Sequence, residues 1–356
     1  MIIGLDVRIL SLTASRTGVP NYVYHLANHL SAIRNVQAVL FTDRPDLNSF
    51  RVVPPCVRFV PWQQSVLPFA AMKAKVDLFH GPGFSLPVWG KFKKVVTIHD
   101  LGFAKHPEWT DDTVSRYLKS IVPLSIRAAD SIIVPTEEIQ ADLLEVYPEL
   151  ARSKNIAVIP MGSLFAASPP RSEPMSTLNR QRPYILHVGT LEPRKNLGTL
   201  IKAFDIATQT QNIPHNLVLI GSKGWKTERL EGTIMGSRVK DRIIIKGFVE
   251  EDELIHWYQR ASLYVQPSHY EGFGMATLDA YCAGLPILST KTGWVASMSD
   301  PAIRFIEEAG NVDEVASGLA YMLEHAEFPL NRNRERWSWG EAMHQHCCLY
   351  ETTVGM

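Results

Sequence analysis

Short apolar runs alternate with longer amphipathic segments along the chain. In the first half, these runs predict strands at residues 2–9, 38–42, 57–60, 78–80, 94–99, 131–135 and 156–160. In the second half, they predict strands at residues 184–188, 217–220, 243–246, 263–266 and 287–289. Apolar positions at helical spacing predict helices between them, including residues 20–32, 114–129, 136–147 and 275–283. Strands that alternate with helices are typical of parallel sheets, so the pattern favours an α/β protein.

The region between the two series has a different composition. Residues 163–183 are rich in Pro, Ser and Arg and show no periodicity, which indicates a linker. A length of 356 residues also suggests two domains. We therefore predict two Rossmann-like domains, at residues 1–165 and 184–337, joined by a linker at 166–183. Ligands of such sheets bind beyond the carboxyl ends of the strands, and we expect a cleft between the domains to gather these loops.

The balance of charges and the cysteine pattern exclude several classes of protein. Lys plus Arg and Asp plus Glu both total 36, which argues against a general nucleic-acid binder. Cys56, Cys282, Cys347 and Cys348 lack the spacing of a zinc site or a disulfide scaffold, so free thiols in a reducing cytosol are expected. The first residues, MIIGLDVRIL, lack the basic region and cleavage site typical of a secretion signal, and no apolar run approaches about 20 residues. These features predict a cytoplasmic protein that can still dock on a membrane.

A glycine-rich turn carries the first candidate chemistry. In PSHYEGFGMATLDAYCAGLP, Gly272 and Gly274 lie where backbone amides open a helix, which is a site suited to phosphate. Glu271 and Asp279 stand on either side of this turn. A bare phosphate would gain nothing from two nearby acids. The acids become useful if the ligand also carries hydroxyl-rich groups at both ends, with Glu271 accepting from a sugar and Asp279 from a ribose. The alternatives are an exposed helical acid at 279 and a first-turn acid at 271.

A second loop offers the matching positive charge. In YILHVGTLEPRKNL, Arg194 and Lys195 lie just outside a helix for which Asn196 is the predicted cap. Cations there oppose the helix dipole, and a bound anion would relieve that misfit. A diphosphate held by these two side chains and the amides near Gly272 and Gly274 explains both loops together. The alternative is a solvated pair of loop cations.

The first half contributes further candidates at strand ends. In VVTIHDLGF, His99 and Asp100 stand at the carboxyl end of a strand, and the alternative is a hydrogen-bonded structural histidine. Gly18 could let a phosphate or a sugar approach the backbone, or it could be a plain turn glycine. His80 is ambiguous between structure and acceptor binding. No GxGxxG follows the first strand, and GxxxxGK[ST] and GxSxG are absent, which weakens the dehydrogenase, P-loop and hydrolase hypotheses.

Taken together, these motifs resemble those of one enzyme family. TIHDLGF with the later HPEW, ADSIIVPTEEIQADL, VIPMG, VGTLEPRKNL and EGFGMATLDAYCAGLPIL are similar to the family-4 retaining glycosyltransferases, also called glycosyl transferases group 1. The resemblance spans nearly the whole chain, and within the family it is to bacterial mannosyl- and rhamnosyltransferases of O-antigen or exopolysaccharide synthesis. It implies the GT-B fold, which is two facing Rossmann-like domains with parallel sheets and an interdomain cleft.

The resemblance also implies a role for each candidate. Arg194 and Lys195 match the residues that bind the donor diphosphate. Glu271 and Asp279 match the two acids of the E-x7-E motif, which contact the donor sugar and the ribose. His99 matches a histidine near the transferred sugar. The implied catalytic residues are His99, Lys195 and Glu271, and the implied donor-binding residues are Gly18, Asp100, Arg194, Lys195, Glu271, Gly272, Phe273, Gly274 and Asp279. No metal and no cofactor are expected, because the basic loop neutralises the donor's charge.

Two departures from the family pattern concern the donor contacts. Position 279 holds Asp instead of Glu, so its reach is one methylene shorter. The N-terminal loop reads GVPNY and lacks the Gly-Arg pair of many relatives, for which Arg16 is a candidate substitute.

Two other segments are assigned by resemblance or composition. The C-terminal residues 338–356 resemble the family's last helix, which packs back on the N-terminal domain, with Trp337 and Trp339 as packing residues. The segment PVWGKFKKVV, residues 87–96, is expected to be a solvated loop, with docking on anionic lipid as the alternative.

The function implied is the transfer of a hexose, mannose from GDP-mannose first, to a saccharide acceptor. The acceptor is expected to be lipid-linked, as in bacterial surface polysaccharide synthesis. Nucleic acid is not an expected partner, whereas peripheral contact with the cytoplasmic face of the inner membrane is. A nucleotide-sugar epimerase of similar fold and a non-catalytic nucleotide-sugar binder remain open as alternatives.

Overall fold

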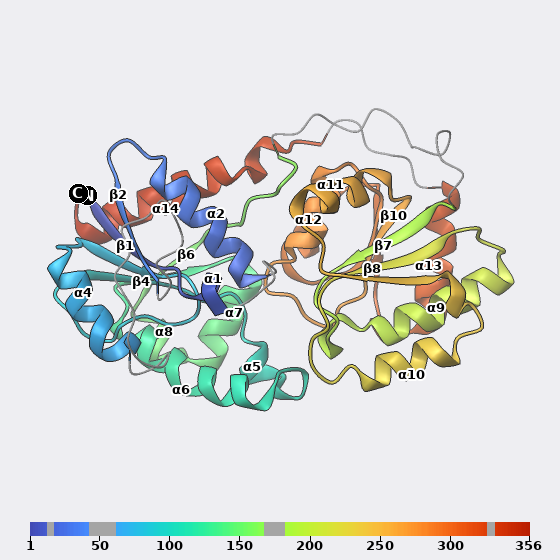
Figure 1. The fold of residues 1–356 in the computed structure, drawn as a ribbon, viewed down its shortest axis with the longest axis horizontal. Coiled ribbons are helices and arrows are strands. Elements are labelled where there is room, and N and C mark those ends of the chain that lie inside the picture. Colours follow the sequence, from blue (N-terminus) through green and yellow to red (C-terminus); the bar gives the residue numbers. More distant parts are fainter. Residues whose placement is uncertain (13–17, 43–61, 167–181, 326–331) are drawn as a thin grey trace. The chain divides into compact units, whose positions relative to one another are not determined.

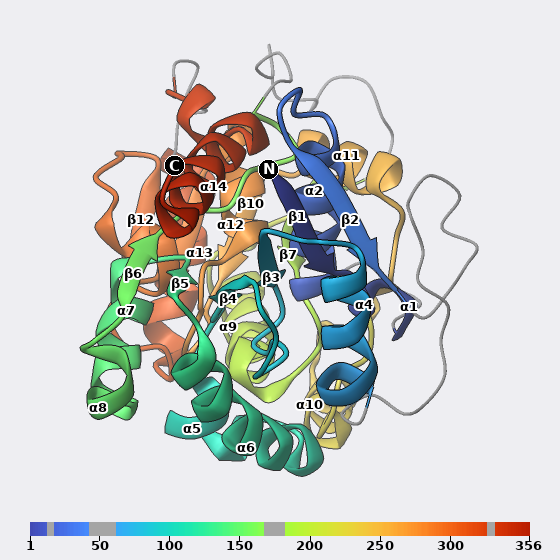
Figure 2. The same ribbon diagram turned by 90° about the vertical axis from the view of Figure 1, so that its left-hand side faces the viewer.

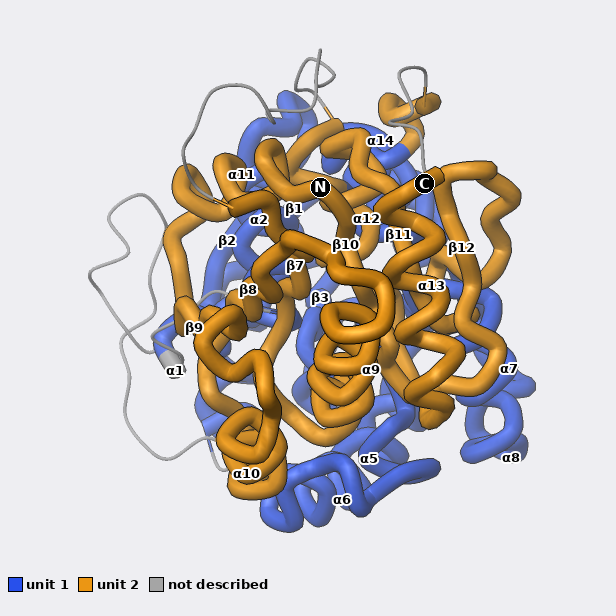
Figure 3. Tube along the Cα trace, turned by 90° about the vertical axis from the view of Figure 1, so that its right-hand side faces the viewer, with its two compact units in different colours: residues 1–162, 337–356 blue, residues 163–336 orange. Residues whose placement is uncertain are grey.

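The chain divides into two compact units. The computed structural model describes residues 1–12, 18–42, 62–166, 182–325 and 332–356. Unit 1 comprises residues 1–162 and 337–356, and unit 2 comprises residues 163–336 (Figure 3). The predicted strand at 57–60, most of the predicted linker and Arg16 lie outside the described residues.

Unit 1 is built on a parallel sheet (Figure 1), whose strands lie in the order β2-β1-β3-β4-β5-β6, as labelled in Figure 2. Its strands are β1 (Ile2–Asp6), β2 (Gln37–Phe41), β3 (Leu78–Gly81), β4 (Lys93–Thr97), β5 (Ser131–Val134) and β6 (Asn155–Val158). Its helices are α1 (Ile9–Leu12), α2 (Val19–Ser31), α4 (Leu67–Lys73), α5 (Gly102–Lys105), α6 (Asp112–Ala128), α7 (Glu137–Val146), α8 (Pro148–Ala151) and α14 (Trp339–Val354).

Helices cover both faces of this sheet (Figure 2). Successive strand residues point to opposite faces, so Phe79 packs toward α4 while the next residue, His80, reaches α14. Polar caps start several of the helices: the Asp111 carboxylate accepts from two amides of α6, and the Thr136 hydroxyl oxygen accepts from one amide of α7.

The C-terminal helix α14 belongs to unit 1. The Tyr22 hydroxyl lies 2.9 Å from His346 Nε2, and the Tyr350 hydroxyl lies 2.7 Å from His80 Nδ1. Trp339 is buried and stacks on His25 at a centroid distance of 4.7 Å. This helix therefore contributes both polar and apolar contacts to the unit.

Unit 2 has a second parallel sheet in the order β12-β11-β10-β7-β8-β9. Its strands are β7 (Tyr184–Val188), β8 (Asn216–Ile220), β9 (Ile243–Gly247), β10 (Leu263–Gln266), β11 (Ile287–Thr290) and β12 (Ile303–Ile306). Its helices are α9 (Leu197–Thr210), α10 (Glu228–Gly236), α11 (Glu251–Arg260), α12 (Met275–Cys282) and α13 (Val312–His325). Apolar residues of α9 and α13, such as Phe204 and Leu319, pack on the strands to form its main core.

The strand order of unit 2 positions its loops. The chain leaves β7 and moves outward through β8 and β9, then returns to β10 on the other side of β7. In such open sheets ligands bind at the point where the strand order reverses, outside the carboxyl ends of the strands. Here that point lies between β7 and β10. The loop 189–195 follows β7, and the loop 267–274 follows β10. In unit 1 the corresponding point lies between β1 and β3.

The α/β prediction is confirmed, and the predicted strands within the described residues are present with ends shifted by at most a few residues. One strand was missed: β12 has Arg304 in the middle of a short apolar run, which hides its pattern. The helix predicted to follow Asn196 is present as α9, which ends at Thr210. Among the described residues, no helix is both long and apolar enough to cross a bilayer.

Candidate functional site

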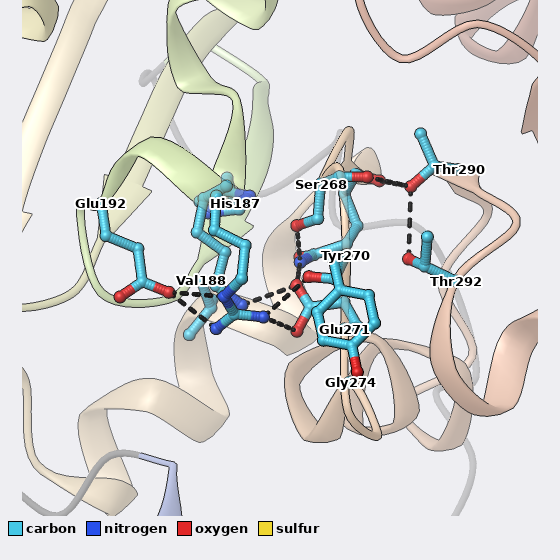
Figure 4. A network of polar contacts seen from close by, with 12 residues as sticks. His187, Val188, Glu192, Ser268, Tyr270, Glu271, Gly274, Thr290 and Thr292 are labelled. Carbon is cyan, nitrogen blue, oxygen red and sulfur yellow. Dashed lines mark hydrogen bonds and ion pairs between the residues drawn. The ribbon is translucent and has the colours of Figure 1, made fainter. Parts of the chain in front are cut away.

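Three of the predicted site residues meet between β7 and β10. Arg194 and Lys195 lie in a single 3-10 turn after β7, and Glu271 lies in the loop after β10. The Lys195 ammonium donates to Glu271 Oε1 at 2.7 Å, and Arg194 donates to Glu271 Oε2 at 2.9 Å (Figure 4). Arg194 also pairs with Glu192 at 2.6 Å. The two loops are therefore joined by a network of ion pairs.

This network is largely removed from water. Glu271 is 4% exposed and Lys195 is 9% exposed. Burial alone would raise the pKa of Glu271, but Lys195 and Arg194 hold it well below its usual value, so the carboxylate is charged. These facts rule out a solvated pair of loop cations. They also rule out a helix first-turn role for Glu271, because α12 begins only at Met275.

A group of polar side chains not singled out from the sequence fixes Glu271 in place. The Gln266 amide donates to Glu271 Oε1 and to the Ser268 hydroxyl, and its own carbonyl oxygen accepts from Tyr264. The Thr290 hydroxyl donates to the Ser268 carbonyl at 2.7 Å. Gln266, at the end of an otherwise apolar strand, was a sequence signal that could have pointed here.

His187 is a second residue that the sequence analysis missed. It is fully buried, and its Nδ1 donates to the Val265 carbonyl at 2.9 Å. Burial lowers its pKa to about 4, so the ring is neutral and Nε2 is an acceptor. That atom has no hydrogen-bond partner among the described residues. A Cβ on Gly189 would lie 3.4 Å from it and 3.6 Å from Lys195 Nζ, so both atoms border the same face of the loop. A lone histidine in the run YILHV was the available signal.

The glycine turn leads directly into α12. Gly274 has a left-handed backbone (φ 88°), which favours glycine, and no side chain caps the first amides of the helix. Trp294 braces the turn, because its backbone amide donates to the Phe273 carbonyl and its indole donates to the Gly274 carbonyl. Phe273 is itself buried. An uncapped helix N-terminus beside two cations is suited to an anionic ligand.

Asp279 lies in α12, and among the described residues it forms no hydrogen bond with the Glu271 network. Its Oδ1 accepts from the Ser163 hydroxyl at 2.7 Å and from the Leu164 amide at 3.0 Å. Oδ2 accepts no hydrogen bond from the described residues. Burial raises the pKa of Asp279 to about 7. Asp279 is therefore not an exposed helical acid. One of its oxygens fastens the first residues of unit 2, and the other remains able to accept a hydrogen bond.

The other predicted residues belong to unit 1. His99 is buried, donates from Nε2 to the Pro82 carbonyl at 2.6 Å, and contacts the Tyr22 ring edge-on. Its Nδ1 has no partner among the described residues, and burial lowers its pKa to about 4. The Asp100 carboxylate accepts from the Gly102 amide at the start of α5. Gly18 is exposed and left-handed (φ 58°) just before α2, with open space where a Cβ would lie.

Comparison with known protein families assigns this chain to a family. A model described as Glycosyltransferase Family 4 matches residues 16–162, and one described as Glycosyl transferases group 1 matches residues 171–338. The chain belongs to these glycosyltransferases. The two matches divide it close to the boundary between the two units.

Individual relatives of this glycosyltransferase are distant. It is similar to an O-antigen chain mannosyltransferase B of Escherichia coli, 25% identical over 252 residues, which cover 69% of this chain and 65% of that protein. The chain thus spans slightly less than two thirds of that relative's length. Among solved structures, it is similar to sucrose-phosphate synthase from Thermosynechococcus elongatus (TM-score 0.75, 22% identity, 99% and 98% of the two chains). It is also similar to Anabaena HepE in complex with UDP-glucose (TM-score 0.71, 15% identity, 99% and 100% of the two chains). These likenesses confirm the GT-B fold class.

Proposed function

We propose that this glycosyltransferase moves a hexose, mannose from GDP-mannose first, to a saccharide acceptor with retention of the anomeric configuration. The observation that carries the proposal is the buried cluster of Lys195, Arg194 and Glu271 beside the uncapped start of α12. It combines positive charge for a diphosphate with a fixed acceptor for sugar hydroxyls. The similarity to a mannosyltransferase of O-antigen synthesis supports mannose as the first sugar to test.

Each residue has a separate task in this proposal. Lys195 and Arg194 stabilise the charge that grows on the diphosphate as the sugar leaves, in a site largely shielded from water and without a metal. Glu271 accepts hydrogen bonds from the donor sugar, and Asp279 Oδ2 accepts one from the ribose. His99, neutral and with a free Nδ1, accepts a hydrogen bond from the sugar being transferred. Gly18 leaves room for the donor to approach the backbone.

A screen of nucleoside diphosphates tests the binding part of the proposal. GDP, UDP, ADP and dTDP are compared by thermal shift, since a ligand that binds the folded state stabilises it by mass action. We expect GDP to raise the melting temperature most. A chain that none of the four stabilises would not have the proposed donor site.

A transfer assay tests the reaction. GDP-mannose and a mannose-containing lipid-linked acceptor are incubated with and without EDTA, and the new linkage is assigned by NMR. We expect transfer in both, with the axial anomeric configuration of the donor kept in the product. GDP-mannose incubated alone with the protein separates the epimerase alternative, because an epimer would then form with no acceptor present.

The acceptor and the location follow from the same proposal. A lipid-linked saccharide has its sugar at the cytoplasmic face of the inner membrane, so the enzyme would work there as a peripheral protein. Fractionation of cells with a tagged chain, followed by a salt wash of the membranes, tests this location.

A further inference from the structure

Two exposed aromatic side chains from different parts of unit 1 lie against each other. Phe69, on α4, is 64% exposed, and Trp89, in the loop before β4, is 38% exposed. Their rings meet edge to face at a centroid distance of 4.9 Å. Val88, next to Trp89, is also 38% exposed. Large apolar side chains that gather on a surface indicate an interaction site more strongly than single ones do.

This aromatic pair is held firmly. The Trp89 indole donates to the Gln64 carbonyl at 2.6 Å, and the Val88 amide donates to the Gln64 side chain at 2.9 Å. The loop is thus tied to the turn that precedes α4, and the apolar groups are presented on a fixed surface instead of a free loop.

Two exposed lysines lie close in sequence to the two aromatic residues. Lys73 lies four residues after Phe69 on α4, which places both side chains on one face of the helix, and Lys91 lies two residues after Trp89. Both lysines are exposed, and neither forms an ion pair with a described residue. Residues 62–94 contain five lysines and a single acid, Asp77, whose carboxylate accepts from the Ile2 amide.

The other residues of the loop have structural tasks. Phe92 is buried against Phe79, the Lys94 ammonium donates to the Gly90 carbonyl, and Lys93 pairs with Asp130. The solvated-loop prediction for residues 87–96 is therefore only partly right. The exposed apolar surface includes Phe69 as well as Trp89. Phe69 lies on α4, outside the loop, so the loop sequence alone does not indicate this surface.

We propose that Phe69, Lys73, Val88, Trp89 and Lys91, the α4 patch, dock this protein on an anionic lipid surface. Aromatic rings suit the boundary between headgroups and acyl chains, and lysines reach the phosphates with their long stems lying along the apolar groups. A second copy of the chain fits less well. A two-fold contact would bring the lysines of both copies together, and lysine is depleted in protein interfaces.

The proposal rests on the proposed function in one respect: a lipid-linked acceptor gives the protein a reason to bind a membrane. Membrane binding can nevertheless be measured without a glycosyl-transfer assay. The full chain is sedimented with vesicles of phosphatidylcholine alone or with about 30% phosphatidylglycerol, at low and high salt. We expect reversible binding to the anionic vesicles only, weakened by salt.

Matched variants locate the surface. Lys73→Gln/Lys91→Gln should weaken binding by about 25-fold, since each basic residue near an anionic surface contributes about five-fold. Phe69→Ala should weaken it several-fold. The controls are Lys202→Gln/Lys240→Gln and Met235→Ala, which remove exposed lysines and a 70% exposed apolar side chain from unit 2 and should bind as the parent does. Melting temperature and GDP affinity, unchanged in all variants, show that the fold and the donor site are intact.

Three results would overturn the proposal. One is equal binding to both kinds of vesicle, and another is equal loss in patch and control variants. The third is a concentration-dependent dimer, detected by light scattering, that Phe69→Ala abolishes, because the patch would then join two copies of the chain. If the parent protein binds anionic vesicles through the α4 patch but transfers no sugar, the result would contradict the proposed function and not the membrane-docking proposal.

Discussion

The cluster of Glu271, Lys195 and Arg194 is electrically balanced when Glu192 is included. Two cations face two carboxylates, all with little exposure to water. A diphosphate entering this cluster competes with the carboxylates for the same donors, and the amides at the start of α12 must supply the rest of its stabilisation. This balance makes the substitution of each charged residue informative in a different way.

Replacing Lys195 should weaken nucleoside diphosphate binding strongly. Lys195→Ala removes a charged donor, a loss of about 1.5–3 kcal/mol, or roughly 10- to 150-fold in affinity. The unfolding free energy should also fall by about 1–3 kcal/mol, because the buried, charged Glu271 loses one of its two ion-pair partners. Calorimetry with GDP measures the first effect, with Lys202→Ala on the exposed side of α9 as control. An affinity equal to that of the control would remove Lys195 from the site.

Replacing Glu271 should separate binding from catalysis. Glu271→Gln keeps the shape but removes the charge that competes for the two cations, so GDP should bind equally well or up to about tenfold more tightly. Transfer should nevertheless fall by about 10²–10³, because the sugar loses its charged acceptor. The comparison is with Glu228→Gln, an exposed acid at the start of α10. A Glu271→Gln variant that binds GDP more weakly would show that the carboxylate supports the diphosphate site instead of opposing it.

Replacing His99 should affect the reaction and spare donor binding. His99→Ala removes the proposed acceptor near the transferred sugar, so kcat should fall by at least tenfold with GDP affinity unchanged. Because burial lowers the pKa of His99 to about 4, the ring is neutral from about pH 5 upward, and the pH profile of the parent enzyme should show no ionisation of this residue there. Equal losses of GDP affinity and transfer would contradict this role.

The sequence indicated these residues but not how they pair. Arg194, Lys195 and Glu271 could be picked out because cations before a helix and an acid beside a glycine turn are locally unexpected. Their direct contact joins positions 76 residues apart, and it depends on the strand order that brings β7 next to β10. The same holds for Asp279 and Ser163, which are 116 residues apart. Local patterns carry no information about such distances.

At the scale of elements, α12 links the glycine turn at residues 272–274 to the start of unit 2. Its N-terminus follows the glycine turn, and Asp279, near the middle of the same helix, holds Ser163 and Leu164. A shift of α12 on donor binding would therefore be passed to the first residues after the unit boundary.

The titration of Asp279 gives this contact a pH dependence. Its folded pKa of about 7 lies above the unfolded value near 4, so its contribution to stability is complete below about pH 4 and is lost as the pH rises through 7. Burial is the main cause, and Glu251 adds to it. Asp279→Asn keeps Oδ1 as acceptor but cannot ionise. We expect the variant to match the parent at about pH 4 and below, and to become progressively more stable than the parent up to pH 8, by at most roughly 4 kcal/mol.

Chemical denaturation at several pH values measures this difference, with Ser163→Ala as the companion variant. Ser163→Ala should cost about 1–3 kcal/mol, since it removes the hydrogen bond to Asp279 Oδ1 and the one that the Ser163 oxygen accepts from the Phe165 amide. The cost should be larger at pH 8 than at pH 4, because the hydroxyl stabilises the ionised carboxylate. If the stability of Asp279→Asn and of the parent change in parallel with pH, Asp279 does not titrate in this range.

Element boundaries were predictable where the local signals agreed. β7 and β10 have the predicted bounds, because each is a short, mostly apolar run that a glycine or a proline follows directly. Asn196 does stand at the N-cap position, as predicted, but its backbone is left-handed (φ 55°) and its amide donates to the Pro267 and Ala309 carbonyls instead of capping the helix. Tertiary partners decided the use of that side chain, and the sequence around it does not show them.

At the scale of the whole molecule, the two units have separate cores and separate parts of the proposed site. Unit 1 is completed by α14, which the chain reaches only after building all of unit 2. Trp339 on this helix is buried and packs directly against Gly162. A Cβ on that glycine would lie 2.5 Å from the indole ring, so no larger residue fits there. Resemblance alone had indicated a packing role for Trp339. Its buried contacts confirm that role within unit 1.

Separate cores should give separate responses to core substitutions and to ligand. Trp339→Ala should destabilise unit 1 by about 3–5 kcal/mol, and Leu200→Ala, in the core of α9, should destabilise unit 2 by about 2–5 kcal/mol. If Lys195 and Arg194 of unit 2 bind GDP as proposed, GDP should stabilise the same transition that Leu200→Ala lowers. Differential scanning calorimetry of the parent and both variants, each with and without GDP, tests this assignment. We expect two transitions, with GDP raising the one that Trp339→Ala leaves in place. A single transition that both substitutions lower and GDP raises to the same extent would mean that the two units unfold as one, and that α14 stabilises unit 2 as much as unit 1.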